Sequence, residues 1–105
     1  MVDGAKVNFG GVERVFAPLN FKALRRLGPK FGLLSKIEPE KGFTPEQQDL
    51  VLEIVQASLL RNYPDVGIEE IAEHLDMANA AKLLIAVLSG SGLVKAQVPG
   101  EAPGP

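Results

Sequence analysis

The middle of the chain has the apolar spacing of a long amphipathic helix. Thr44-Pro45-Glu46-Gln47 combines an N-cap residue, a proline at the first helical position and the glutamine of a capping box. We therefore expect a helix over about residues 45–61, ended by Asn62-Tyr63-Pro64-Asp65. Its apolar side chains cover an arc of roughly 220°, which indicates packing on two sides. The residues expected to be most buried are Leu50, Ile54 and Val55.

Shorter helices are predicted on either side of this long one. Asn20 and Asp76 can each act as an N-cap, because their side chains accept a hydrogen bond from the first helical turn. Phe21, Leu24 and Leu27 fall toward one side of the first short helix, which is the side we expect to be buried. The short helices predicted in this way cover about residues 20–28, 68–75 and 77–88.

The N-terminal part of the chain predicts a β-hairpin over about residues 6–17. Gly10-Gly11 lies between two runs that favour strands, and glycine readily adopts the positive φ angles of a two-residue hairpin loop. Val15 and Phe16 are adjacent apolar residues and break the alternation, which a β-bulge would accommodate. At the other end, residues 95–105 are rich in proline and glycine and are expected to form a disordered tail.

These elements together predict a mainly α fold. We expect a single small helical domain over residues 1–94 with an N-terminal β-hairpin, and an α+β arrangement is the alternative. The absence of cysteine excludes disulfides and thiolate chemistry and fits a reducing cytoplasm. No apolar run approaches the roughly 20 residues of a membrane span, and the N-terminus lacks the apolar core of a signal peptide. We therefore expect a cytoplasmic protein without a membrane partner.

Charge is unevenly distributed along the sequence. Residues 1–43 carry eight Lys/Arg and four Asp/Glu, whereas residues 44–98 carry three Lys/Arg and eight Asp/Glu. The first part is therefore at +4 and the second at −5. This asymmetry indicates either two solvated faces of opposite sign or an attraction between copies of the chain.

The sequence contains no constellation typical of an enzyme or a cofactor site. His74 is the single histidine, and its place beside an apolar stripe favours a half-buried structural role. Glu69, Glu70 and Glu73 point off one short helix, which indicates a solvated face rather than paired catalytic carboxylates. We therefore expect no catalytic residues, no cofactor and no metal.

The last two predicted helices have the order and spacing of a helix-turn-helix, so a winged-helix-like DNA-binding regulator is an alternative. A recognition helix needs polar side chains that reach bases and phosphates. Over residues 78–88 the chain offers only Asn79 and Lys82, in a half with a charge of −5. Such a charge repels the DNA backbone, so no nucleic acid partner is expected.

Two surfaces are candidates for binding a protein partner. The last helix has an apolar arc of roughly 220°, which is wide for a terminal helix with few neighbours. The hairpin could cover this arc, or the arc could be exposed to a partner or to another copy. The first short helix carries a cluster of cations. The apolar candidates are Leu83, Ile85 and Val87, and the basic candidates are Lys22, Arg25 and Arg26.

The order of these elements resembles that of the small tail assembly chaperones of long-tailed bacteriophages and prophages. The resemblance covers about residues 6–92. It rests on the hairpin and basic helix of Val7 to Leu27, including Pro18-Leu19-Asn20-Phe21, on the capped helix of Thr44 to Leu60, and on the turn and short helix of Tyr63 to Ile71.

The resemblance implies a non-enzymatic protein that acts in the cytoplasm of the bacterial host. Such proteins bind the long tape-measure protein, keep it soluble and help tail-tube subunits assemble around it. They are usually absent from the finished virion, and the family has no catalytic residues to carry over. Some members are extended by a translational frameshift. A structural tail component of the virion is a further alternative.

Overall fold

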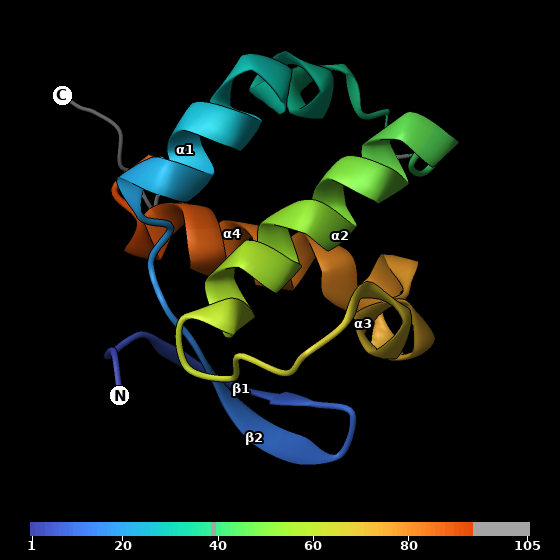
Figure 1. Cartoon of the computed structure of the whole chain (residues 1–105). Helices are drawn as coiled ribbons and strands as arrows, with labels where there is room; N and C mark the ends of the chain where they lie inside the picture. The colour runs from blue at the N-terminus through green and yellow to red at the C-terminus, as the bar shows by residue number, and fades with distance from the viewer. Residues whose placement is uncertain (39, 94–105) are drawn as a thin grey trace, which may run out of the picture.

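The hairpin and helices follow one another along the chain in the predicted order. The computed structural model describes residues 1–38 and 40–93, so the tail predicted over 95–105 lies outside the described residues. The elements are β1 (Ala5–Phe9), β2 (Val12–Phe16), α1 (Phe21–Leu27), a 3-10 helix η1 (Gly28–Lys36), α2 (Pro45–Leu60), α3 (Ile68–His74) and α4 (Met77–Gly90) (Figure 1). The prediction of a mainly α fold with an N-terminal β-hairpin is confirmed.

The hairpin is regular and contains no bulge. β1 and β2 pair in antiparallel register from Ala5 opposite Phe16 to Phe9 opposite Val12. Gly10 and Gly11 adopt φ angles of 65° and 82°, as the predicted two-residue turn requires. Phe9 and Phe16 are buried, and their rings meet edge to face at a centroid distance of 5.8 Å. This aromatic pair joins the hairpin to the helical core.

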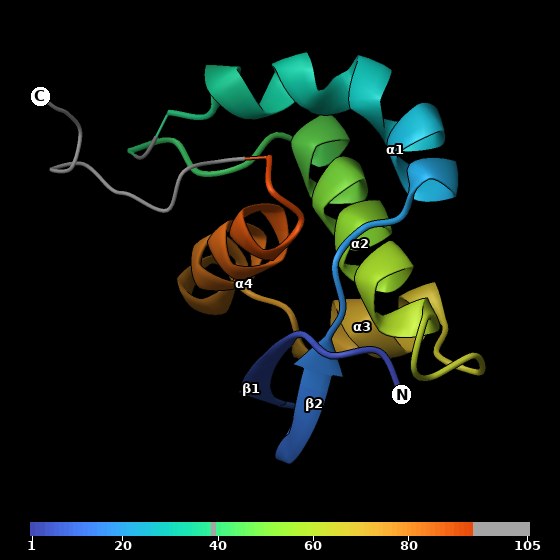
Figure 2. The same ribbon diagram turned by 90° about the vertical axis from the view of Figure 1, so that its left-hand side faces the viewer.

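Helix α2 is the centre of the domain. Its N-terminus carries the predicted capping box, in which the Thr44 hydroxyl accepts from the Gln47 N–H and the Gln47 side chain accepts from the Thr44 N–H. It packs against α1, η1, α3, α4 and β2, and α4 also packs against β1 (Figures 1 and 2). Leu50, Ile54 and Val55 are all buried, so their predicted central place in the core is confirmed.

The elbow between β2 and α1 is clamped by polar side chains from distant helices. The buried Ser58 hydroxyl donates to the Ala17 carbonyl at 2.7 Å. The Arg61 guanidinium donates to the Pro18 carbonyl at 3.0 Å. The Leu19 N–H donates to the Ser91 hydroxyl at 2.7 Å. Three consecutive backbone groups are therefore satisfied by the ends of α2 and α4, which fixes the direction in which α1 leaves the hairpin.

The caps of the other helices also agree with the sequence. Asn20 accepts a hydrogen bond from the Ala23 N–H, and Asp76 forms a capping box with Asn79. α4 runs two residues past the predicted end. It is terminated by Gly92 at a φ of 79°, which lets the chain turn back.

One prediction about α1 is wrong. Phe21 was expected to face the core, but its side chain is 82 % exposed. α1 is only seven residues long and buries Ala23 and Leu27 against the rest of the domain. Phe21 is its first residue, at the edge of the domain, where no other element covers it.

Candidate protein-binding site

The structure separates the three apolar candidates of α4. Leu83 and Val87 are each only 1 % exposed, so the prediction that they lie on an exposed strip is wrong. α4 packs against α2 and also against β1, and these two neighbours together cover most of its wide apolar arc. Ile85 lies on the opposite side of the helix and is 62 % exposed.

The outer face of α4 is consequently small and weakly apolar. Besides Ile85, the exposed residues of this face are Ala78, Ala81 and Lys82. Met77 is 50 % exposed at the start of the helix. A single isoleucine between alanines buries little area in a complex, so α4 alone is a poor docking surface.

The basic candidates on α1 are all exposed. Lys22, Arg25 and Arg26 point away from the buried Ala23 and Leu27. Residues four apart on a helix lie on the same face, so Lys22 and Arg26 form one row, while Phe21 and Arg25 form a second. The two rows give α1 a surface that is both cationic and aromatic.

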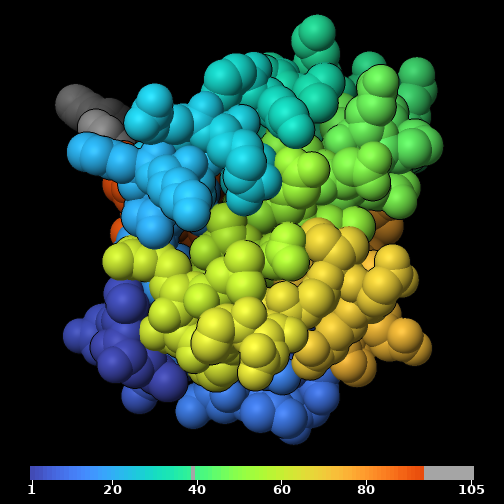
Figure 3. Space-filling view, viewed as in Figure 1, coloured from blue at the N-terminus to red at the C-terminus, as the bar shows by residue number. Residues whose placement is uncertain are grey.

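Lys22 and Arg26 line a groove of about 250 Å³ between α1 and the C-terminal end of α2. On the face shown in Figure 3, the side chains of α1 lie directly beside those of this end of α2. We call this feature the basic groove, and its lining residues are Asn20, Lys22, Ala23, Arg26, Ala57, Leu60 and Arg61. Ala23 and Ala57 are small enough for α1 and α2 to approach each other. Leu60, which also lines the groove, remains 38 % exposed.

Arg61 is a cation of the basic groove that sequence reasoning missed. It follows directly after α2 and belongs to the acidic part of the sequence, yet it joins Lys22 and Arg26 in the groove. Its guanidinium is held by the Pro18 carbonyl, which occupies one of its five N–H donors. The helix dipole also favours a cation at this C-terminus. Only the packing of α1 on α2 brings these three side chains together.

Within residues 1–38 and 40–93, the cations of this region form no ion pair with a neighbouring carboxylate. In the described part of the chain, the ion pairs join Arg14 to Glu70, Lys30 to Glu53 and Lys41 to Glu38. None of the three basic groove residues, nor Arg25, has a carboxylate oxygen within 4.0 Å among residues 1–38 and 40–93. As far as the structure describes the chain, the groove therefore presents positive charge without a paired carboxylate.

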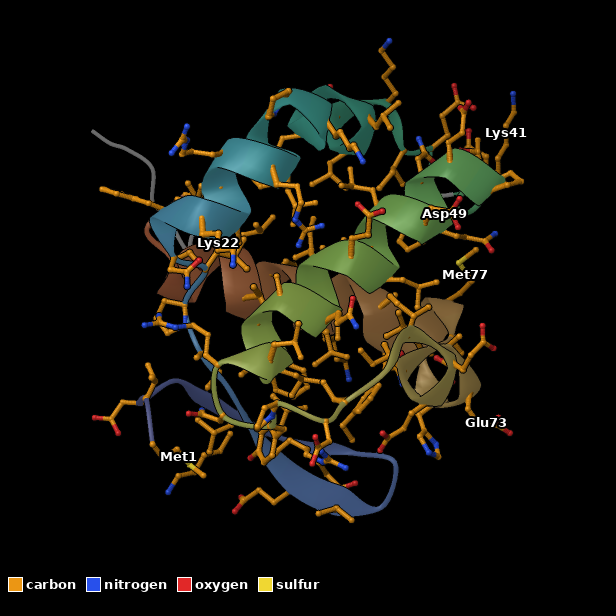
Figure 4. The ribbon with its side chains drawn as sticks, in the orientation of Figure 1. Met1, Lys22, Lys41, Asp49, Glu73 and Met77 are labelled. Carbon is orange, nitrogen blue, oxygen red and sulfur yellow. The ribbon has the colours of Figure 1, made fainter. Side chains whose placement is uncertain are left out.

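Acidic side chains gather on the other side of the domain. Glu69, Glu70 and Glu73 lie on α3 and are exposed. Figure 4 shows Lys22 on α1 at the left of the view, and Asp49 and Glu73 at its right. The acidic face of α3 therefore lies apart from the cations of α1.

A second groove is mostly apolar, with Gln48 and Asp76 as its polar lining residues. It has a volume of about 240 Å³ and lies between α2, the end of α3 and the start of α4. Phe43, Leu52 and Met77 are among its lining residues. The terminal methyl of Met77 lies close to Gly42, since a Cβ atom placed on this glycine would come within 2.9 Å of it.

His74 lies at the end of α3 and is more exposed than predicted. Its ring packs edge-on against Phe9, with 5.9 Å between the centroids, and it contacts the hairpin turn at Gly10. Within residues 1–38 and 40–93, no group of three or more His, Asp or Glu side chains could hold a metal ion. In the same residues, no helix has the length and apolar character needed to cross a bilayer.

Scans of the chain against protein-family models, curated protein sequences and solved structures found no match. A functional proposal therefore rests on the residues and surfaces described above.

Proposed function

We propose that this protein is a tail assembly chaperone of a long-tailed bacteriophage or prophage. It binds the tape-measure protein in the host cytoplasm and keeps it soluble while tail-tube subunits assemble around it. The proposal is supported by the resemblance over residues 6–92. It is equally supported by a surface suited to protein binding, and it assigns no catalytic residue, cofactor or metal.

The observation that carries this proposal is the basic groove. A chaperone for a long helical client needs charge for steering and solubility, together with some apolar contact area. The groove combines Lys22, Arg26 and Arg61 with the partly exposed Leu60. Phe21, which is strongly exposed, follows the groove residue Asn20 in the chain but does not itself line the groove. Aromatic residues and arginines are the residue types that most often dominate binding energy at protein interfaces.

The alternative of a DNA-binding regulator has less support. Its recognition helix would be α4, whose outward side chains are Ala78, Ala81, Lys82 and Ile85. One lysine on an alanine-rich face offers little for reading bases or binding phosphates. The preceding helix, α3, is acidic on its outer face and repels the DNA backbone.

Co-expression with the tape-measure protein encoded in the same gene cluster tests the proposal. We expect the tape-measure protein to remain soluble and to co-purify with the tagged chaperone at about 0.15 M salt. A tape-measure protein that is equally soluble without the chaperone, and that is not retained by it, contradicts the proposal.

Proteomics of purified particles separates the chaperone from a structural tail component. We expect the protein to be absent from finished particles. Its presence in them in stoichiometric amounts favours the virion component instead.

A further inference from the structure

We propose that the basic groove recognises a client helix that carries acidic residues four positions apart beside an aliphatic residue. This inference rests on the proposed function and specifies which part of the client is bound. It assigns the contact to Lys22, Arg26 and Arg61, which two separate helices bring to one groove.

The spacing of the cations determines the spacing of the partner's charges. Lys22 and Arg26 are separated by four residues of α1, which corresponds to a rise of about 6 Å along the helix. Glutamates four residues apart on a client helix have the same rise, so two carboxylates can face the two cations at once.

Arg61 adds a third cation from the opposite wall of the groove. The hydrogen bond to the Pro18 carbonyl restrains its guanidinium before any partner arrives. A restrained guanidinium loses less conformational freedom when it binds, and it can hold a carboxylate with two parallel hydrogen bonds. Pro18 is itself part of the clamped elbow, so the fold positions this arginine.

The walls of the groove also require an apolar side chain. Ala23 and Ala57 are small and nearly buried, and Leu60 contributes exposed aliphatic surface. The volume of about 250 Å³ is smaller than the roughly 300–1,000 Å³ of small-molecule pockets. These features fit an aliphatic side chain inserted from a partner helix.

The acidic helix α3 of a second copy fits this groove less well than a separate client does. Glu70 already pairs with Arg14, and the buried Ile71 faces the core. Glu69 and Glu73 remain, with Ala72 as the exposed apolar residue between them. An alanine offers little contact to the aliphatic surface of Leu60, so we assign the groove to the client.

Fluorescence anisotropy with synthetic peptides tests this assignment directly. The probe is a labelled helical peptide of about four Glu-Ala-Ala-Leu repeats, which places glutamates four apart beside leucines. The matched control peptide has glutamine in place of each glutamate. We expect Lys22→Gln and Arg26→Gln each to weaken binding of the acidic peptide about fivefold to tenfold.

Arg25→Gln is the matched control variant, because it removes the same charge from the same helix at a residue outside the groove. We expect it to weaken binding less than twofold, an amount consistent with screened long-range attraction. Arg61→Lys keeps the charge without the planar guanidinium, and we expect an intermediate loss. If Arg61→Lys does not fold, the two α1 variants decide the result.

Equal losses in Arg25→Gln and Lys22→Gln, or equal binding of both peptides, overturn the inference. So does a DNA duplex that binds more tightly than the acidic peptide, or self-association that Lys22→Gln abolishes in sedimentation. If the Lys22→Gln, Arg26→Gln double variant retains the tape-measure protein fully, the inference fails while the proposed function stands. If the wild type fails to retain the tape-measure protein, the proposed function fails, and peptide binding alone decides the chemistry of the groove.

Discussion

Helices α1 and α4 both carry candidate binding residues, but those of α1 are exposed in the folded domain and most of those of α4 are buried. α1 keeps Lys22, Arg25 and Arg26 at the surface and adds Arg61 from α2. α4 loses Leu83 to the core and keeps only Ile85 of its three candidates exposed, because Val87 is buried as well. Folding therefore adds a cation to the candidate surface on α1, whereas it buries two of the three apolar candidates on α4.

The difference follows from the cost of burial. Lysine and arginine are almost never fully buried unless they are paired, so a cluster of cations on a short helix predicts a surface reliably. A wide apolar arc on a helix indicates only that another element covers it, and that element can belong to the same chain. Here α2 and the hairpin strand β1 both pack against α4. A wide arc in a small domain therefore predicts two intramolecular contacts as readily as one partner.

A pair of alanine substitutions tests most directly the contrast between buried and exposed positions of α4. We expect Leu83→Ala to lower the free energy of unfolding by about 2–5 kcal/mol, because it leaves a cavity in the core. Ile85→Ala removes an equally aliphatic side chain from the same helix at an exposed position. It should change that free energy by less than about 0.5 kcal/mol. Chemical denaturation followed by circular dichroism measures both, and equal effects would contradict the burial described for α4.

The elbow that orients α1 gives the next largest effect. We expect Ser58→Ala to lower the free energy of unfolding by about 1–3 kcal/mol, because the Ala17 carbonyl loses its buried donor. Ser35→Ala is a suitable control, since that hydroxyl donates to a carbonyl at an exposed position. Thermal melts of the two variants make the comparison. A Ser58→Ala variant as stable as the wild type would show that this hydrogen bond does not hold the elbow.

Local structure was predictable because its causes lie within a few residues. Asn20, Thr44 and Asp76 cap helices at the predicted positions, and Gly10 and Gly11 form the predicted turn. These features depend on side chains that bond to their own backbone and on glycine's freedom at positive φ.

The site was only partly predictable, because its membership depends on packing. Arg61 reaches Lys22 and Arg26 only after α2 lies against α1, and no local pattern carries that information. Phe21 was misplaced for a related reason. Helical periodicity gives the direction of a side chain relative to its helix, but it does not say where the neighbouring elements end.

A salt series and the substitution Ile85→Glu distinguish the basic groove from the outer face of α4 as the binding site for the proposed client, the tape-measure protein. We expect an increase to about 0.5 M salt to weaken the complex about tenfold, because the basic groove relies on partly exposed charges. Ile85→Glu should leave retention unchanged, since the outer face of α4 contributes little. Pull-downs over a salt series measure both effects. Loss of the complex in Ile85→Glu together with insensitivity to salt would transfer the binding site to α4.

The smallest expected effect concerns the stability of the basic groove itself. Lys22 and Arg26 are exposed and form no ion pair within the described residues. Replacing either by glutamine should therefore change the free energy of unfolding by less than about 0.5 kcal/mol. A partner-binding role predicts this neutrality, because the cations then serve the complex rather than the fold. Denaturation curves of Lys22→Gln and Arg26→Gln test it, and a loss above about 1 kcal/mol would assign these cations to the stability of α1 instead.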